Sequence, residues 1–317
     1  MENEDGQRET RREEINEICK QFYSNLFQSR VTISPPNLLE DLDPPPSVLI
    51  SEVRDALKEM PTGKIPGKDD KSAEVLHAGG YTLWRALAKR LNAYMAQCKI
   101  PSDWKSSKTI LLYKKGDRED FKNYRPICLL STIYRLCTKI ISNRLSRTFD
   151  EQQPREQAGF RGRYSTIDNI FVLNQLLQKS IEHNLPICLV FFDDEKAFDS
   201  VETNAVLTAL KQQVIENNYI KLLSELNNGC SMEITLFHSP LRIPIQKGVR
   251  QGDPISPKLF TAFLEMVFRN INWSGGVNID GEWITHLRFA DDIVLVSRDT
   301  TEAEKMLHEL DQQGKKV

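Results

Sequence analysis

The sequence predicts an α+β protein whose strands lie mostly in its C-terminal half. Apolar residues recur every three or four positions in several long segments, which is the spacing of amphipathic helices. Short apolar or alternating runs, bounded by Gly, Pro and Asp, indicate strands. With 317 residues and 40% hydrophobic content, the chain can bury a core as one large domain or two small ones.

The N-terminal 50 residues predict one helix and a linker. Within residues 1–30, apolar side chains at i, i+3 and i+4 spacing indicate an amphipathic helix: Ile15, Ile18, Phe22, Tyr23, Leu26 and Phe27. The segment SPPNLLEDLDPPPS (34–47) is rich in Pro and acidic residues, which is typical of a linker.

The following segment predicts helices with one strand among them. Helices are expected over residues 51–60, 82–98 and 129–149. The segment PTGKIPGKDDKS (61–72) predicts a loop, and WKSSKTILLYKKGD (104–117) predicts a strand that enters a basic turn.

Most of the remaining strands are expected after residue 185. The run PICLVFFDD (186–194) is β-rich and ends in acidic residues, and a helix is expected from about Val201. The alternating segment 231–248 breaks at Ser239-Pro240 and predicts a hairpin. Two short strands are expected on either side of Asp291 and Asp292, and helices are expected over residues 256–270 and 301–314.

The composition argues against several classes of protein. The six cysteines are scattered without a C-x-x-C pair, so neither a zinc site nor a disulfide framework is expected. No apolar run approaches ~18 residues, and the N-terminus is charged, so neither a membrane span nor a signal peptide is expected. The chain is therefore expected to be intracellular, in the nucleus or the cytoplasm.

Basic residues are concentrated in one part of the chain. The net charge is −2, yet residues 102–163 hold 14 Lys or Arg against 7 Asp or Glu. Such a local excess suits a polyanionic partner, although charge alone favours the interpretation of an ordinary solvated face.

The run FADDIVLV (289–296) places two carboxylates side by side between apolar residues. Adjacent like charges destabilise each other unless something compensates them. Asp193 ends a second apolar run, 98 residues before Asp291. Carboxylates converging from two strands would form an oxygen site for Mg²⁺, and two such ions assist phosphoryl displacement. The alternative is that each acid is an exposed strand-end residue, which would be the better reading for Asp193 alone.

Five segments in this order resemble one enzyme family. They are WKSSKTILLYKKGDREDFKNYRPICLLSTIYRL, EQAGFRGRYSTIDNI, LVFFDDEKAFDSVE, KGVRQGDPISPKLF and LRFADDIVLVS. Together they resemble the reverse transcriptase domain of LINE-type (non-LTR) retrotransposons, which is related to the group II intron and telomerase polymerases. A weaker similarity extends upstream through EVRDALKEMPTGKIPG.

The resemblance implies the fingers and palm of a right-hand polymerase. The palm would be a small antiparallel sheet packed on helices. Residues 1–50 would form the helix and linker, and 51–317 the reverse transcriptase domain, with fingers over about 51–185 and an incomplete palm over about 186–317. The family's thumb would follow the last residues, LDQQGKKV, and is expected to be missing, as is an upstream endonuclease.

The resemblance also implies an activity, RNA-directed DNA polymerase. The catalytic and metal-binding residues would be Asp193, Asp291 and Asp292, which would hold two Mg²⁺ ions, with Mn²⁺ as a possible substitute. The partners would be an RNA template, a DNA primer and a deoxynucleoside triphosphate, without a membrane.

Five residues match positions where the family binds the incoming nucleotide: Lys114, Arg125, Phe198, Gln251 and Gly252. Arg125 would contact the triphosphate, because a guanidinium bonds phosphate bidentately. Phe198 would clash with a ribose 2′-hydroxyl. A phenylalanine is more often simply core, but the spacing of five residues from Asp193 favours this role. Lys114 is equally typical of a solvated hairpin, and Gln251-Gly252 of an ordinary turn before a helix capped by Ser256.

The segment GFRGRYST (159–166) is expected to contact the template. Gly159, Phe160, Arg161 and Arg163 match the family there. Basic residues interleaved with aromatic ones suit a surface that follows a nucleic-acid strand.

Some features depart from the family pattern and leave alternatives open. Asp194 stands where an aromatic or apolar residue is usual, and GKIPGKDDKS differs from the usual loop. A polymerase without a thumb is expected to hold primer and template weakly, because backbone contacts supply much of the affinity. One alternative is therefore a catalytically inactive retrotransposon remnant that binds at most nucleic acid or protein. Another is a viral RNA-dependent RNA polymerase, which FADD and Phe198 disfavour.

Overall fold

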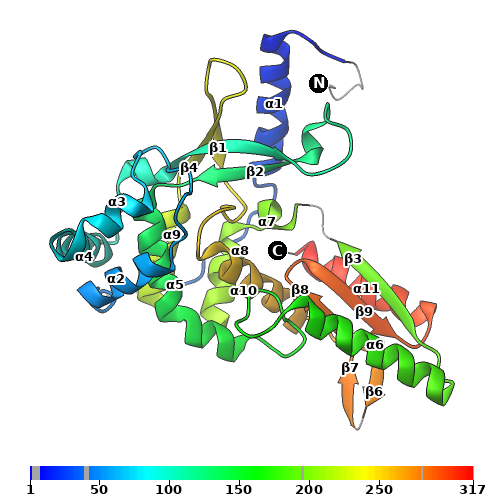
Figure 1. Cartoon of the computed structure of the whole chain (residues 1–317). Coiled ribbons are helices and arrows are strands. Elements are labelled where there is room, and N and C mark those ends of the chain that lie inside the picture. Colours follow the sequence, from blue (N-terminus) through cyan, green and yellow to red (C-terminus); the bar gives the residue numbers. More distant parts are fainter. Residues whose placement is uncertain (2–7, 39–42, 194–195, 280, 317) are drawn as a thin grey trace. The chain divides into compact units, whose positions relative to one another are not determined.

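The computed structural model describes residues 1, 8–38, 43–193, 196–279 and 281–316 (Figure 1). The chain forms two compact units, each made of two stretches of sequence. The first unit contains Met1–Ser146 and Phe198–Ser256, and the second contains Arg147–Ala197 and Pro257–Val317. These limits come from contacts within each unit, and the fingers and palm boundaries expected above remain a prediction.

The first unit is built on a four-stranded sheet of order β2-β1-β4-β5. Its strands are β1 (Ser106–Tyr113), β2 (Tyr124–Leu129), β4 (Cys230–Ile234) and β5 (Leu241–Ile245). Neighbouring strands are antiparallel except β1 and β4, which are parallel. The sheet therefore joins two segments that lie more than 100 residues apart in the sequence.

Helix α1 (Arg12–Phe27) covers part of this sheet because its apolar residues lie on one face. Cys19, Tyr23 and Phe27 are spaced by four residues and are buried against Met232 and Ile243 of the sheet. Each large apolar side chain that is removed from water contributes about 1.5–3 kcal/mol. Figure 1 shows α1 beside the hairpin of β4 and β5.

The other elements of the first unit are mostly helical. They are α2 (Ile50–Glu59), α3 (Ala73–Ala78), α4 (Gly80–Gln97), the 3₁₀ turns η1 (Ser102–Lys105) and η2 (Phe121–Asn123), the first part of α5 (Thr132–Gln152), α7 from Phe198 (Ala197–Ser200), α8 (Thr203–Gln212) and α9 (Asn217–Asn227). The Pro-rich segment is tied to them, since the Arg144 guanidinium donates to both Glu52 carboxylate oxygens and to the carbonyls of Pro46 and Ser47.

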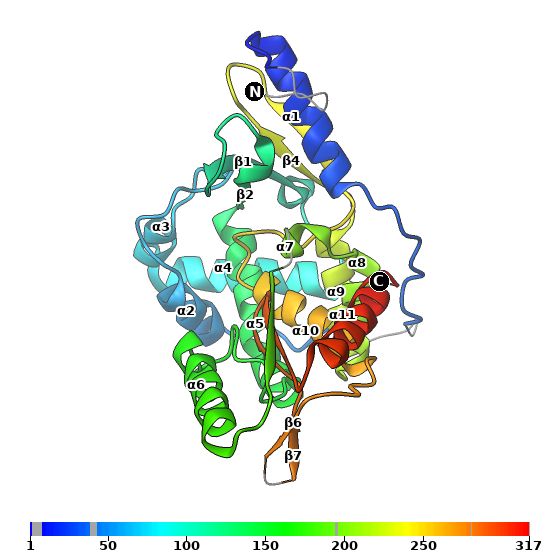
Figure 2. The same cartoon turned by 90° about the vertical axis from the view of Figure 1, so that its right-hand side faces the viewer.

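The second unit contains a three-stranded antiparallel sheet of order β3-β9-β8. Its strands are β3 (Cys188–Asp193), β8 (His286–Phe289) and β9 (Asp292–Ser297). The unit also holds α6 (Thr166–His183), α10 (Ser256–Arg269), α11 (Thr300–Gly314) and the small hairpin β6 (Val277–Ile279) and β7 (Glu282–Ile284). Figure 2 shows α11 and the β6–β7 hairpin from a second side.

One face of this second sheet packs into the core of its unit. Ile293 and Leu295 of β9 pack against residues of α10 and α11, such as Phe268 and Met306. The expected α+β class, with an antiparallel sheet packed on helices, is confirmed. Among the described residues, no helix is both long and apolar enough to cross a membrane.

Candidate active site

The three predicted metal carboxylates lie together at one end of the second sheet. Asp193 is the last residue of β3, Asp292 is the first residue of β9, and the two are directly opposite each other in the antiparallel ladder. Such residues project to the same face, with Cβ atoms roughly 5 Å apart. Asp291 immediately precedes Asp292, in the two-residue loop between β8 and β9.

The alternation of side chains places this carboxylate pair on the face opposite the core. Phe192 and Ile293 pack into the core of the second unit. Because side chains alternate along a strand, Asp193 and Asp292 face the other way, and both are exposed. Phe191 shares their face and is 71% exposed. At this surface the two carboxyl groups therefore avoid the cost of burial.

The donor set fits Mg²⁺ in its chemistry. Within the described part of the chain, no group of three or more His, Cys, Asp or Glu residues is arranged to hold a metal ion. A pair of carboxylates is nevertheless sufficient protein ligation for Mg²⁺, which commonly keeps waters and substrate phosphates as its other ligands. Asp194, the departure noted in the sequence, lies outside the described residues.

The predicted template segment meets the loop that carries Asp291. A Cβ atom on Gly159 would lie 2.2 Å from the backbone nitrogen of Ala290, so only glycine fits there. Phe160 is exposed, and Arg161 places its guanidinium 4.6 Å from the centre of the Tyr164 ring. The structure thus brings the start of this segment to the carboxylates' hairpin.

Three of the five predicted nucleotide-binding residues are held together in the first unit. The Val249 N–H donates to the Phe198 carbonyl at 2.8 Å. The Gln251 side-chain amide donates to the Asp199 carboxylate at 2.8 Å, and the Gln251 carbonyl accepts from Cys128 N–H at 3.0 Å. Phe198, Gln251 and the adjoining Gly252 are therefore fixed near strand β2.

Gly252 is required by the backbone of this turn. Its φ is +107°, and a Cβ atom there would lie 2.9 Å from the Cys128 carbonyl oxygen. The glycine thus allows the turn to lie close to strand β2. Arg125 is exposed on the same strand, and Lys114 is exposed directly after β1.

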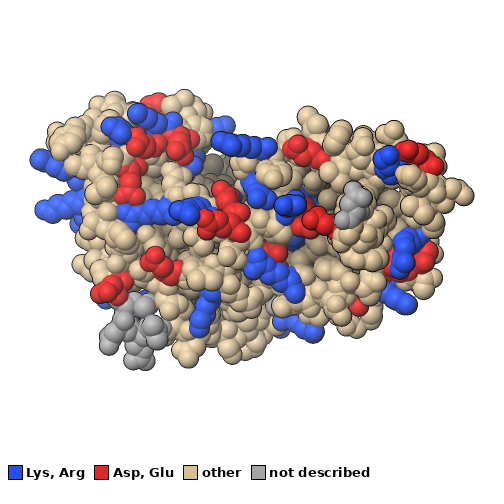
Figure 3. All heavy atoms as spheres, turned by 90° about the horizontal axis from the view of Figure 1, so that it is seen from below, with Lys and Arg blue, Asp and Glu red and all other residues tan. Residues whose placement is uncertain are grey.

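The charge balance of the basic segment differs from what its composition suggests. Several of its cations are neutralised by ion pairs: Lys105 with Glu225, Lys139 with Glu59, Arg144 with Glu52, Arg147 with Glu151 and Arg155 with Glu282. Among the described residues, the four candidate cations have no acidic ion-pair partner: Lys114, Arg125, Arg161 and Arg163. On the face shown in Figure 3, acidic and basic side chains are interspersed.

A buried polar cluster beside Gln251 was not predicted. Arg250 donates to the carbonyls of Trp104 and Leu226 at 3.0 and 2.7 Å. The Tyr134 hydroxyl donates to the Asp253 carboxylate at 2.6 Å, and burial raises the pKa of Asp253. These groups hold the turn on which Gln251 and Gly252 lie. In the sequence, this cluster could have been inferred from the two charged residues, Arg250 and Asp253, on either side of Gln251-Gly252.

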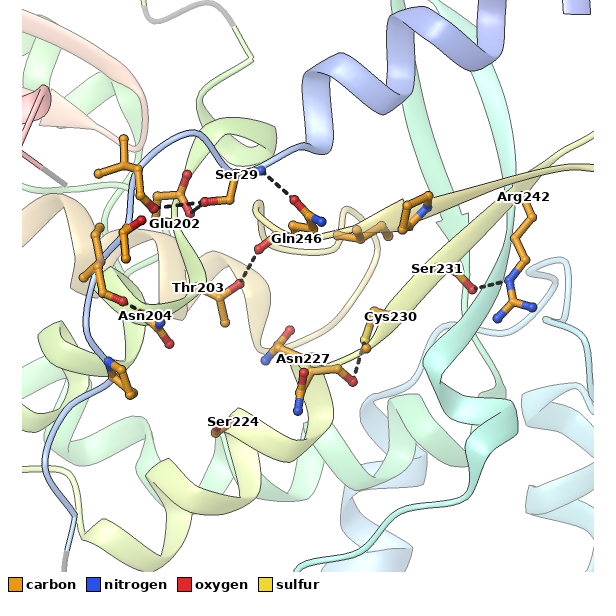
Figure 4. A pocket seen from close by; sticks show the side chains of 18 residues that line it. Ser29, Glu202, Thr203, Asn204, Ser224, Asn227, Cys230, Ser231, Arg242 and Gln246 are labelled. Carbon is orange, nitrogen blue, oxygen red and sulfur yellow. Dashed lines mark hydrogen bonds between the residues drawn. The ribbon is translucent and has the colours of Figure 1, made fainter. Parts of the chain in front are cut away.

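Several cavities in the described part of the chain lie away from the predicted residues, and two of them illustrate their character. The first unit has one of about 900 Å³, whose hydroxyl and amide groups largely bond within the chain, for example Ser29 to Glu202 and Arg242 to Ser231 (Figure 4). The second unit has one of about 550 Å³, walled partly by Trp273 and His286, whose rings stack 4.7 Å apart.

Comparison with known proteins identifies relatives over most of the chain. It is 29% identical over 311 residues to the transposon TX1 uncharacterized 149 kDa protein of Xenopus laevis, covering 92% of this chain and 24% of that protein. It is also 29% identical to a retrovirus-related Pol polyprotein from the type-1 retrotransposable element R2 of Popillia japonica, covering 73% of this chain and 32% of that protein. The chain thus spans about a quarter to a third of the length of these relatives.

Similarity to solved structures is weaker. Apo telomerase from Candida tropicalis, truncated from its C-terminal domain, shares 13% identity with a TM-score of 0.45 over 72% of this chain and 51% of that one.

A family model matches residues 113–317, which is more than half of the chain and includes most of the motifs quoted above. The model is that of the reverse transcriptase (RNA-dependent DNA polymerase), in agreement with the resemblance to non-LTR retrotransposon proteins. The chain belongs to the reverse transcriptase family.

Proposed function

We propose that this chain is the polymerase part of a non-LTR retrotransposon protein and catalyses RNA-directed DNA synthesis. The supporting observation is the pairing of Asp193 with Asp292 across two strands, next to Asp291 and on the face away from the core. The names of its relatives, which include a probable RNA-directed DNA polymerase from transposon BS of Drosophila melanogaster, agree with this reaction. The free thiols of the six cysteines suit a reducing setting in the nucleus or the cytoplasm.

The proposed reaction is attack by a primer 3′-hydroxyl on the α-phosphate of a deoxynucleoside triphosphate, with release of pyrophosphate. Asp193, Asp291 and Asp292 would bind two Mg²⁺ ions, which supply positive charge to the attacking and leaving oxygens. The carboxylates themselves fix where that charge lies relative to the sheet.

The candidates in the first unit would bind the nucleotide. Arg125 and Lys114 have no acidic partner among the described residues and would contact the triphosphate. Phe198 is held at its backbone by Val249 and would exclude a ribose 2′-hydroxyl. Gln251 and Gly252 would support the nucleotide from the adjoining turn.

The candidates in the second unit would bind the template. Phe160 is exposed and offers a ring on which a base stacks, and Arg161 and Arg163 offer charge to the phosphates. Gly159 would allow this segment to lie directly against the hairpin that carries the catalytic carboxylates.

Primer extension tests the proposal. The chain is given a poly(rA)–oligo(dT) duplex, dTTP and Mg²⁺, beside the double variant Asp291→Asn, Asp292→Asn and the single variant Asp193→Asn. We expect extension by the unaltered chain and its loss in both variants. Asp311→Asn is the matched control, because Asp311 is an exposed carboxylate of α11 in the same unit and should leave the rate unchanged.

Three results would contradict the proposal. Extension that survives Asp193→Asn would remove the proposed carboxylates from the reaction. No extension by folded protein that still binds the duplex would favour the alternative of a nucleic-acid-binding remnant. A preference for ribonucleotides over dTTP would instead support an RNA polymerase.

A further inference from the structure

The loop between β8 and β9 holds an alanine in a conformation that favours glycine. The pairing of Phe289 with Asp292 leaves only Ala290 and Asp291 in the loop. Ala290 has φ of +59°, in the left-handed region where a Cβ atom is unfavourable. Two-residue hairpins need positive φ at the first loop position, and glycine usually supplies it. The loop that carries Asp291 therefore needs an external restraint.

A single buried side chain contacts both backbone groups of Ala290. The Gln157 side-chain carbonyl accepts from the Ala290 N–H at 2.9 Å, and its amide nitrogen lies 3.4 Å from the Ala290 carbonyl. The same side-chain oxygen accepts from the Gly159 N–H at 2.8 Å. Gln157 is fully buried, at 0% exposure, so water does not compete for these bonds.

The backbone around Gln157 is itself fixed to the sheet. Residue 157 forms a parallel bridge with Arg288 of β8, and bonds run from Arg288 N–H to Glu156 and from Ala158 N–H to Arg288, at 2.7 and 2.9 Å. Gln153 donates to the carbonyls of residues 157 and 159, both at 2.9 Å. The backbone bonds to β8 thus give Gln157 a rigid base that does not depend on Gln153.

We propose that Gln157 is a positioning residue, which fixes the Ala290-Asp291 loop so that Asp291 and Asp292 keep the geometry needed to bind metal and nucleotide. The inference rests on the proposed function for its effect on catalysis. Its structural part, restraint of the loop through the Ala290 N–H, stands independently. A misplacement of about 1 Å at a reacting centre costs on the order of 10²-fold in rate.

Gln157→Met tests this role, because methionine fills a similar volume and lacks both polar groups. Gln153→Met is the matched control, since Gln153 is a buried glutamine that bonds the same segment without contacting Ala290. We expect Gln157→Met to lower kcat by about 10²-fold, raise the Mg²⁺ concentration for half-maximal rate, and leave KM for the duplex within a few fold. Gln153→Met should change kcat far less.

A second substitution provides a rescue. Glycine adopts positive φ without strain, so Ala290→Gly should restore most of kcat in the Gln157→Met chain and change little alone. A purely structural role of Gln157 in residues 156–160 would not be rescued in this way. Equal losses in the two methionine variants, or no rescue by glycine, would overturn the proposal.

Hydrogen exchange separates this inference from the proposed function. The Ala290 amide should exchange slowly in the unaltered chain, much faster in Gln157→Met, and slowly in Gln153→Met. If the unaltered chain proves inactive, this pattern still supports the positioning role while the polymerase proposal fails. Equal exchange at Ala290 in all three proteins would overturn it, whatever the activity.

Discussion

At the scale of single residues, a side chain's place in the β3–β9 ladder decides its environment. Asp193 and Asp292 face away from the core, whereas Phe192 and Ile293, one position along, face into it. The sequence allowed the prediction that the three carboxylates lie close together, because each follows or precedes an apolar run. It could not predict Gln157, since nothing local links that residue to Ala290, 133 positions later.

His286 is a residue whose burial has a pH consequence. It is 7% exposed, and burial, followed by the nearby positive charge of Arg288, lowers its pKa to about 2. Between pH 6.5 and 2 the unfolded chain therefore binds one more proton at this site than the folded chain. The free energy of unfolding falls as the pH is lowered, by about 1.5 kcal/mol from pH 6.5 to 5.

His286→Phe should remove this part of the acid sensitivity while keeping a ring against Trp273. Urea denaturation at several pH values measures it, as a shallower loss of unfolding free energy below pH 6.5. The exposed His308 of α11 is the control, and His308→Phe should keep the original slope. An unchanged slope in His286→Phe would show that this histidine is not buried in its neutral form.

At the scale of elements, an ion pair joins α10 to β8. The Arg288 guanidinium donates to the Glu265 carboxylate at 2.8 Å, and the two side chains are 1% and 6% exposed. Arg288 also lies 4.1 Å from the centre of the Phe268 ring. Removing one partner leaves a buried charge without compensation, whereas removing both does not.

We expect Glu265→Gln to cost about 3–5 kcal/mol of unfolding free energy, and Glu265→Leu with Arg288→Met to recover most of it. Urea titration followed by hydrogen exchange in β8 and α10 measures both. The control is Arg269→Gln, which removes the half-exposed partner of the same carboxylate and should cost only about 1 kcal/mol. A small loss in Glu265→Gln would mean that water reaches Arg288.

Element prediction succeeded where one apolar period was clear. The expected helices over 51–60 and 256–270 correspond to α2 and α10, and the hairpin over 231–248 corresponds to β4 and β5. Strand β2 was not predicted because it contains Pro126, and the structure places it at a sheet edge, where proline is tolerated. Helix α6 was also missed.

In the structure, the apolar residues of α6 do not form a single buried stripe. Ile167, Ile170 and Ile181 are exposed, while Leu176 is buried.

The pairing of β1 with β4 could not be predicted from the sequence. Alternation indicates which face of a strand is apolar, but it does not specify the neighbouring strand.

At the scale of the whole molecule, the candidate phosphate contacts are divided between the two units. Lys114 and Arg125 belong to the first, and Arg161 and Arg163 to the second. Each phosphate contact contributes about 0.7–0.9 to the slope of log affinity against log salt concentration. The net charge of −2 does not indicate this salt dependence, because the candidate contacts are local groups of basic residues.

Replacing either pair by glutamine should therefore reduce the slope of log affinity against log salt concentration for an RNA–DNA duplex by about 1.4–1.8. When all four residues are replaced, the effects of the two pairs should add. Fluorescence anisotropy over a series of NaCl concentrations measures this. The control is the double variant Arg147→Gln, Arg155→Gln, with the same charge change at two ion-paired arginines of the basic segment. Equal slopes in all variants would exclude these residues from phosphate contact.

The long-range strand pairs also have a consequence for how the chain acquires its structure. Strand β3 ends at residue 193, and its partner β9 begins at residue 292. On a ribosome that adds about 5–20 residues per second, β3 waits roughly 5–20 s for that partner. Its edge is unprotected meanwhile, as are Val190 and Phe192, which pack against the core only in the folded unit. Long-range strand pairs form slowly, so we expect slow folding, assisted by chaperones during synthesis, from the same ladder that assembles the carboxylates.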